Sequence, residues 1–176
     1  TFNAVKNMNT PVLVHVFTKK GKGVEFAEKD AVKYYSLPGK SKNSHNHNAL
    51  DYSKVFGHSI RQLSEKNNQI LCVTAAMEIG TGMQPFIDKY PDRYIDVGIA
   101  EEHAVTYAAA LCAAGEKVII AIYSTFMQRG YDQIIHDVAL QEIPLILCMD
   151  RSGLVGEDGP THHGVFDISF MRHIPN

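Results

Sequence analysis

The stretch YIDVGIAEEHAVTYAAALCAAGEKVIIAI, residues 94–122, decides the fold of this chain. Residues 94–97 and 118–122 are short apolar runs rich in β-branched and aromatic side chains, which favours buried strands. Residues 101–114 between them are alanine-rich and are followed by Gly115, where a helix typically ends. A strand, a helix and a second apolar strand form the repeating unit of a parallel sheet.

The same alternation extends to both sides of this stretch. We expect helices at 52–65, 83–89 and 126–141, and strands at 70–74 and 145–149. Alternating β and α elements with apolar strands predict an α/β fold, with a mostly parallel β-sheet and helices on both of its faces. The helix at 101–114 is apolar nearly all round, so we expect it to be buried.

The first fifty residues follow a different pattern. Residues 12–18, VLVHVFT, form a continuous apolar run, as expected for a strand buried on both faces. Residues 36–50 are polar and rich in Ser and Asn. We therefore expect a strand and lead-in from a preceding domain at 1–38, a flexible linker or loop at 39–50, and the main domain at 51–176. The chain begins at a Thr and stops after Pro175-Asn176, so we expect it to be a piece of a longer protein.

Composition excludes several classes of protein. The 176 residues are 45% hydrophobic and 20% charged, which is too apolar for disorder, and the net charge of −2 argues against nucleic-acid or membrane-surface binding. No apolar stretch approaches the length of a membrane span, roughly 18 residues. Cys72, Cys112 and Cys148 each lie in an apolar run, which is typical of buried, reduced thiols. His45 and His47 in the polar tract are more typical of solvated side chains than of a metal site.

Ligands of parallel α/β folds bind at the carboxyl ends of the strands. This rule predicts that the site loops are the four segments 74–82, 98–103, 123–130 and 150–163. In the second of these, Glu101 and Glu102 begin a helix, where either carboxylate could simply complement the helix dipole. A carboxylate desolvated at that position would instead suit proton exchange near neutral pH.

The third and fourth segments carry aromatic and charged residues. Ser124 or Thr125 can cap the following helix. Phe126 and Arg129 are three residues apart, so they share a helix face and could hold a flat ring, although a core Phe with a solvated Arg is the alternative. The loop at 150–163 combines glycines with charged and imidazole groups, of which Arg151 suits a phosphorylated or carboxylate ligand.

Three runs carry a resemblance to a known family: DVGIAEEHAV (96–105), IYSTFMQRGYDQIIHDVALQ (122–141) and DRSGLVGEDGPTHHGVFD (150–167). They closely resemble the 1-deoxy-D-xylulose 5-phosphate synthase family, and the TKKGKG turn (18–23) and TAAMEIGTGM (74–83) support this. The resemblance covers residues 11–176 except the tract at 39–50. It is closer to these synthases than to transketolase or a pyruvate dehydrogenase beta-subunit, their relatives in fold.

The resemblance implies a thiamine-diphosphate-binding fold of the pyrimidine-domain type. It implies condensation of pyruvate with glyceraldehyde 3-phosphate and release of CO2, which makes a precursor of isoprenoids, thiamine and pyridoxal. It also implies a homodimeric transferase of three domains, in the bacterial cytoplasm or a plastid-type organelle. In this family Mg²⁺ is bound by an N-terminal domain that lies outside these residues, so we expect the isolated chain to bind the cofactor weakly and to be inactive.

The resemblance also assigns roles to residues. Glu101 would hydrogen-bond the ring nitrogen of the aminopyrimidine and so promote loss of the thiazolium proton. The other cofactor-binding residues would be Lys20 near the diphosphate and, around the pyrimidine, Ala76, Met77, Phe126 and Arg129. The substrate-binding residues would be Tyr123, Arg151 at the acceptor phosphate, and Asp158 and His162, with His162 also catalytic.

Two departures and two alternatives stay open at this point. Many relatives have Gln at the position of Glu102 and His at the position of Tyr35, so neither residue is assigned a role. A transketolase-type carbon transferase would use the same cofactor but ketose donors instead of pyruvate. A non-catalytic assembly domain could use the alanine-rich helix as an interface. It would have no need for four residues together at loop positions: Glu101, Phe126, Arg129 and His162.

Overall fold

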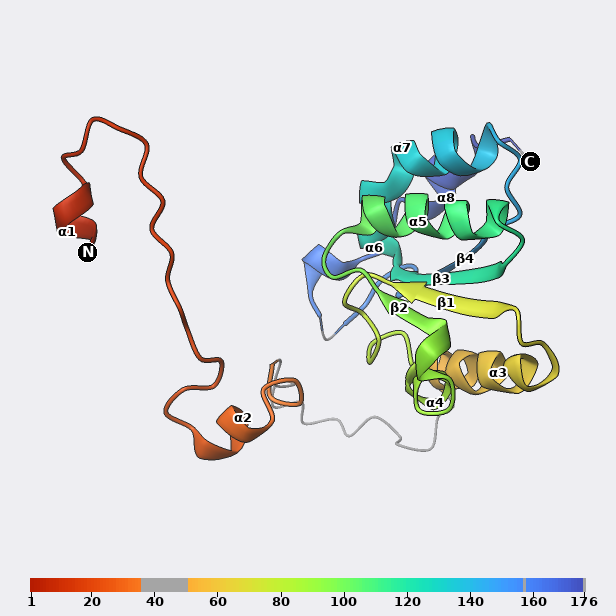
Figure 1. Ribbon diagram of the computed structural model, residues 1–176, viewed down its shortest axis with the longest axis horizontal. Helices are drawn as coiled ribbons and strands as arrows, with labels where there is room; N and C mark the ends of the chain where they lie inside the picture. Colours follow the sequence, from red (N-terminus) through yellow and green to blue (C-terminus); the bar gives the residue numbers. More distant parts are fainter. Residues whose placement is uncertain (36–50, 157, 176) are drawn as a thin grey trace. The chain divides into compact units, whose positions relative to one another are not determined.

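The computed structural model describes residues 1–35, 51–156 and 158–175. The chain divides into two compact units, Thr1–Asn43 and Ser44–Asn176 (Figure 1).

The first unit contains two short helices, α1 (Phe2–Val5) and α2 (Glu25–Lys29). The strand predicted at 12–18 is wrong for the described residues: the segment is assigned to no strand, and Leu13 and Phe17 are 93% and 87% exposed. A strand needs a partner for its backbone N–H and C=O groups, and the described residues of this unit supply none. The basic turn packs against α2 through an ion pair between Lys19 and Glu28.

The second unit is built on a four-stranded sheet in the order β2-β1-β3-β4, with every neighbouring pair parallel. The strands are β1 (Ile70–Thr74), β2 (Tyr94–Asp96), β3 (Lys117–Tyr123) and β4 (Ile146–Asp150). The central strands β1 and β3 are almost entirely buried, as their continuous apolar runs predict. The predicted parallel α/β fold is confirmed.

Each face of the sheet has its own core, because successive side chains of a strand point to opposite faces. On one face Val73, Ile120 and Ile122 pack with α5 (Glu101–Ala113). On the other face Cys72 and Ile119 pack in a second cluster, which also contains buried residues of α3 (Tyr52–Lys66) and α4 (Gln84–Ile87). Figure 1 shows α5 and α7 on one side of the sheet and α3 and α4 on the other.

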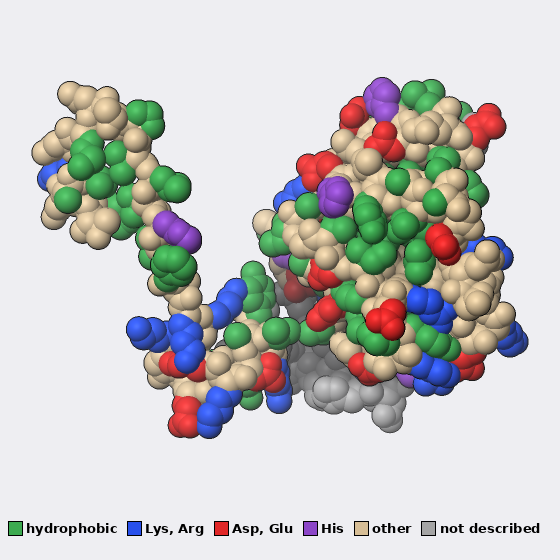
Figure 2. Space-filling view, in the orientation of Figure 1, with side chains coloured by type: hydrophobic (Ala, Val, Ile, Leu, Met, Phe, Trp, Pro, Cys, Tyr) green, Lys and Arg blue, Asp and Glu red, His purple; other side chains and the backbone are tan. Residues whose placement is uncertain are grey.

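Helix α5 ends as predicted but is not buried all round. Ala114 is its C-cap and Gly115 has φ +99°, the left-handed conformation that glycine adopts at low cost. Only one face is buried, the one that carries Ala104, Val105 and Ala108. Figure 2 shows apolar side chains on the outward side of this helix. Tyr107 of α5 is 38% exposed. Small alanines make such exposure inexpensive, so a high apolar content did not imply full burial.

The single helix predicted at 126–141 is instead a series of short pieces. It runs as α6 (Ser124–Met127), a 3-10 turn η2 (Gln128–Gly130), α7 (Tyr131–Gln133) and a π-helical segment η3 (Ile134–Ala139). Gly130 is the last residue of η2 and allows a close approach to α5, since a Cβ there would lie 2.9 Å from Val105. Glycine is also a poor helix former. The β-branched residues of η3 are also weak α-helix formers.

The remaining described elements are the short helices η1 (Pro91–Arg93), η4 (Pro160–His162) and α8 (Asp167–Met171). Cys72 and Cys112 are buried and Cys148 is half-buried, and all three are free thiols, in agreement with the sequence-based expectation. Across the described residues, no helix combines the length and the apolar character needed to cross a membrane.

Candidate functional site at the carboxyl edge of the sheet

The carboxyl ends of the strands lie in register at one edge of the sheet. Thr74 of β1 is paired with Ala121 and with Asp96, and Tyr123 of β3 is paired with Asp150, the last residue of β4. The four predicted site loops leave from this edge, as the rule for parallel sheets requires. Their side chains form two connected groups, one around Glu101 and one around Arg151.

Glu101 is buried at the first position of α5, with 1% of its surface exposed. Its Oε1 accepts a hydrogen bond of 2.6 Å from Nη1 of Arg129, whose side chain is 49% exposed. The guanidinium gives the buried carboxylate a charged hydrogen-bonding partner in place of water. Glu102 is exposed, which separates the two glutamates that the sequence pattern alone left equivalent.

Phe126 lies between two other aromatic rings and a cation. The Tyr123 ring is stacked on it at 5.9 Å, and the His162 ring meets it edge-on at 5.2 Å. The guanidinium carbon of Arg129 lies 4.9 Å from the centre of the Phe126 ring, which confirms that the two residues share a face. Phe126 is only partly buried, so the aromatic cluster borders solvent.

The predicted capping role of Ser124 or Thr125 is wrong, because the N-cap of α6 is Tyr123 and no side chain caps the helix. The Ser124 hydroxyl donates instead to Asp167 at 3.1 Å, and the Thr125 hydroxyl donates to the carbonyl of Thr161. The side chains that suit a cap are used here for contacts between loops.

Asp167 is a buried carboxylate that joins two site loops. It accepts hydrogen bonds from the hydroxyls of Ser124 and Ser152, at 3.1 and 2.5 Å, and from the backbone N–H of Ile168. Burial alone would raise the pKa of Asp167, but the hydrogen bonds outweigh it and lower the pKa. Because Ser124 and Ser152 adjoin the Phe126 and Arg151 loops, Asp167 ties these loops together.

Asp96 has a similar role on the other side of the site. Its Oδ1 accepts the backbone N–H groups of Ala76 at 2.8 Å and of Gly98 at 2.9 Å. Both residues have positive φ, +59° for Ala76 and +74° for Gly98, so each loop is held in a conformation that few residues adopt freely. The carboxylate thus links the Ala76–Met77 turn to the loop that precedes Glu101.

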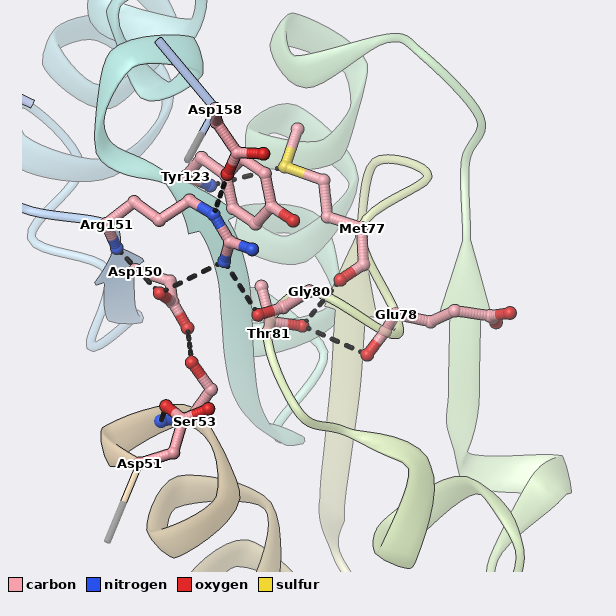
Figure 3. Close-up of polar contacts among 10 residues, drawn as sticks. All are labelled: Asp51, Ser53, Met77, Glu78, Gly80, Thr81, Tyr123, Asp150, Arg151 and Asp158. Atoms are coloured by element: carbon pink, nitrogen blue, oxygen red, sulfur yellow. Dashed lines mark hydrogen bonds and ion pairs between the residues drawn. The ribbon is translucent and has the colours of Figure 1, made fainter. Parts of the chain in front are cut away.

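Arg151 is the centre of the second group (Figure 3). Its Nε donates to Asp158 at 2.9 Å and its Nη1 donates to the carbonyl of Gly80 at 2.8 Å. Its guanidinium carbon lies 3.9 Å from the centre of the Tyr123 ring. Burial is the largest cause of a raised pKa of the Tyr123 phenol, so this ring stays neutral beside the cation.

A cavity of about 890 Å³ adjoins Arg151. It lies between the first turn of α3, the loop at 79–82 and the end of β4. Its volume falls in the range of small-molecule sites, roughly 300–1,000 Å³. A guanidinium at the rim of such a cavity can bind a phosphate or carboxylate.

The structure therefore brings most of the predicted site residues into these two groups: Met77, Glu101, Tyr123, Phe126, Arg129, Arg151, Asp158 and His162. Ala76 lies in the adjacent turn held by Asp96. Lys20 belongs to the first unit, where its Nζ lies 3.3 Å from the centre of the Tyr35 ring, so its cofactor role stays a prediction.

Sequence reasoning missed the acidic residues that organise the site, Asp96, Asp150 and Asp167. The only signal available was the position of Asp96 and Asp150 near the ends of strands, and Asp167 begins α8, a helix that the sequence pattern did not predict. His45 and His47 lie outside the described residues. Within residues 1–35, 51–156 and 158–175, no cluster of three or more His, Cys, Asp or Glu side chains could hold a metal ion.

Comparison with known proteins identifies similar sequences and folds. The family model "Transketolase, pyrimidine binding domain" matches residues 48–176. The chain is 52% identical over 180 residues to the 1-deoxy-D-xylulose-5-phosphate synthase of Thermomicrobium roseum and 51% identical over 176 residues to that of Oleidesulfovibrio alaskensis. These alignments cover 100% and 96% of this chain but only 28% of each relative, so the chain spans little more than a quarter of their length.

Solved structures show the same fold at low sequence identity. The transketolase of Leishmania mexicana has a TM-score of 0.65 at 22% identity, over 80% of this chain and 22% of that one. The transketolase of Campylobacter jejuni has a TM-score of 0.63 at 20% identity, over 85% of this chain and 25% of that one. At this low identity, the two transketolases show that this chain shares their fold and nothing further.

Proposed function

Because this chain belongs to the transketolase pyrimidine-binding domain family, we propose that it forms the pyrimidine-binding half of a thiamine-diphosphate-dependent 1-deoxy-D-xylulose-5-phosphate synthase. The enzyme would join pyruvate to glyceraldehyde 3-phosphate with release of CO2. The observation that carries the proposal is Glu101, a carboxylate buried at the start of α5 and linked through Arg129 to the half-buried ring of Phe126.

The residues at this edge suit the aminopyrimidine of the cofactor. A flat heteroaromatic ring needs a stacking surface, which Phe126 offers beside the cation of Arg129. A ring nitrogen needs a hydrogen-bonding partner away from water, which Glu101 offers. Ala76 and Met77 would line the same ring, and Lys20 would reach the diphosphate. When bound, thiamine diphosphate supplies the carbon nucleophile and electron sink for decarboxylation of a 2-oxo acid.

The residues of the chain would do the rest by holding and moving protons. Glu101 would hold a proton at the pyrimidine nitrogen, and the burial of its carboxylate would keep water from competing for that proton. Arg129 would preserve the orientation of Glu101 by occupying Oε1 and leaving Oε2 for the ring. His162, beside Phe126, would exchange protons with substrate oxygens.

Arg151, Asp158 and Tyr123 would form the substrate side. The guanidinium of Arg151 would bind the phosphate of the acceptor, and the adjoining cavity would hold its carbon chain. Asp158 would pass from its ion pair with Arg151 to a substrate hydroxyl. Tyr123, neutral and stacked against both Arg151 and Phe126, would separate the phosphate site from the cofactor.

We also propose that another domain supplies Mg²⁺ and the diphosphate anchor, and that the protein acts as a homodimer in the bacterial cytoplasm or in a plastid-type organelle. The 176 residues alone would then bind thiamine diphosphate weakly. Calorimetric titration of this chain tests the point, and micromolar affinity would contradict it.

The decisive test replaces Glu101 in the full-length protein and follows CO2 release from pyruvate in the presence of glyceraldehyde 3-phosphate. Glu101→Gln should lower kcat by about 10²–10⁴-fold, the usual contribution of a positioned proton-transfer group. Glu102→Gln is the matched control, since it lies on the same helical turn but is exposed, and it should keep the wild-type rate. Unchanged turnover of Glu101→Gln would contradict the proposal. Turnover of ketose phosphates without CO2 release would instead indicate a transketolase.

A further inference from the structure

We propose that Asp150 and Ser53 are positioning residues that orient the guanidinium of Arg151 toward the phosphate of the acceptor. The inference rests on the proposed role of Arg151, and it adds two residues that the sequence motifs did not single out. Neither touches the aromatic cluster around Phe126 in the contacts described above, so their effect would be confined to the phosphate side of the site.

Arg151 has an unusual backbone conformation that Asp150 stabilises. Its φ is +57°, in the left-handed region that a residue with a Cβ seldom adopts. Oδ1 of Asp150 accepts the backbone N–H of Arg151 at 2.6 Å and also lies 3.4 Å from Nη1 of the same residue. One carboxylate oxygen therefore contacts both the backbone and the head group of Arg151, and so limits how the side chain can leave the end of β4.

Asp150 is itself restrained by Ser53. Its Oδ2 accepts the hydroxyl of Ser53 at 2.6 Å, across 97 residues of sequence. Ser53 lies in the first turn of α3, whose N-cap is Asp51, and the Asp51 carboxylate accepts the backbone N–H of Ser53. Figure 3 shows Asp150 between Ser53 and Arg151, with one oxygen directed to each. The helix start thereby sets the orientation of the carboxylate that holds Arg151.

The two acidic partners of Arg151 differ in burial and in how many of their oxygens are occupied. Asp158 contacts only the Nε side and lies in an exposed part of the loop. Asp150 is half-buried, and both of its oxygens are occupied. A phosphate can replace the exposed Asp158 at Nε, whereas Asp150, which is held by Ser53 and by the backbone N–H of Arg151, keeps its contact with Nη1 and so fixes the orientation of the guanidinium.

The experiment compares two acceptors in the full-length protein, glyceraldehyde 3-phosphate and unphosphorylated D-glyceraldehyde, each with pyruvate. Ser53→Ala and Asp150→Asn should raise KM for the phosphorylated acceptor by about tenfold, the usual effect of losing one hydrogen bond to a charged group. KM for D-glyceraldehyde and for pyruvate should not change. Ser53→Thr keeps the hydroxyl and should restore the wild-type KM.

Glu65→Gln is the control, because it weakens the 2.7 Å ion pair with Lys89 near the other end of the same helix without touching Asp150 or Arg151. It should leave the ratio of the two acceptor KM values unchanged. If Ser53→Ala and Asp150→Asn raise both KM values equally, or neither, the positioning role is refuted.

A binding measurement separates this inference from the proposed reaction. Titration of the full-length protein with glycerol 3-phosphate should give a dissociation constant about tenfold weaker in both variants. If the wild type releases no CO2 but both variants bind glycerol 3-phosphate about tenfold more weakly than the wild type, the proposed reaction fails and the positioning role stands. If binding is the same in all three proteins, the positioning role fails whatever the activity.

Discussion

Replacement of Arg129 by Met tests the buried ion pair that the proposed site depends on. The change keeps an unbranched side chain but removes the guanidinium, which lies 4.9 Å from the centre of the Phe126 ring and donates to Glu101 at 2.6 Å. Loss of one partner costs about 3–5 kcal/mol for a fully buried pair and under about 1 kcal/mol for an exposed one. Here Glu101 is buried and the Arg129 side chain is half exposed, so we expect a loss of about 2 kcal/mol of unfolding free energy.

The assay is urea unfolding of the 176-residue chain, followed by far-ultraviolet circular dichroism. With an m-value of about 2 kcal/mol/M, a loss of 2 kcal/mol lowers the midpoint by about 1 M. In Arg129→Met the buried Glu101 carboxylate has no charged partner, and Glu101→Gln removes that charge. The double variant Arg129→Met/Glu101→Gln should therefore recover about 1 kcal/mol or more of the loss. Lys29→Met breaks the exposed ion pair with Glu25 and should cost under about 0.5 kcal/mol. An Arg129→Met midpoint equal to that of wild type, or additive single and double variants, would refute the reasoning.

Two further predictions concern the loops. Gly164→Ala should destabilise the chain by about 1–3 kcal/mol, because its Cβ would overlap the Ser124 hydroxyl and lie 2.6 Å from the carbonyl of Arg151. Gly156→Ala is the control, because no described atom lies within 4 Å of the added Cβ. Equal melting temperatures of the two variants would contradict the packing around Gly164. Asp167 has a lowered pKa in the folded chain, so its charge stabilises the fold above the unfolded pKa, about 4, and this contribution is lost as pH falls through the folded pKa. In urea titrations at pH 7 and below pH 4, Asp167→Asn should therefore be less stable than wild type at pH 7 and closer to it in acid, and a difference that is constant with pH would count against the assignment.

The sheet could be predicted from the sequence because buried parallel strands need continuous apolar runs, and those runs are visible at 70–74 and 118–122. The same pattern failed at 12–18, where an apolar run says nothing about whether a pairing strand is present. The helix predicted at 126–141 is helical from Ser124 to Ala139, but its winding changes between α, 3-10 and π, which the apolar periodicity does not reveal.

The sequence could predict those site residues whose location follows from the residue type and its position within one helix or strand. Phe126 and Arg129 share a face because of helix geometry alone, and Glu101 lies at a helix start because the preceding strand ends there. Pattern could not choose between Glu101 and Glu102, since the choice depends on which one the sheet covers. The Ser53–Asp150 contact was beyond reach, because it joins residues 97 positions apart that no local rule relates.

The shared acceptor at Asp96 has a consequence for motion at the site. Ala76 and Gly98 donate to the same carboxylate oxygen, so the two loops they belong to are mechanically coupled. At about 1 kcal/mol for each bond, releasing both loops costs about 2 kcal/mol, and the released state is populated only about 3% of the time. One aspartate therefore restrains both the turn that carries Met77 and the loop that leads into Glu101, and its replacement would loosen both loops together.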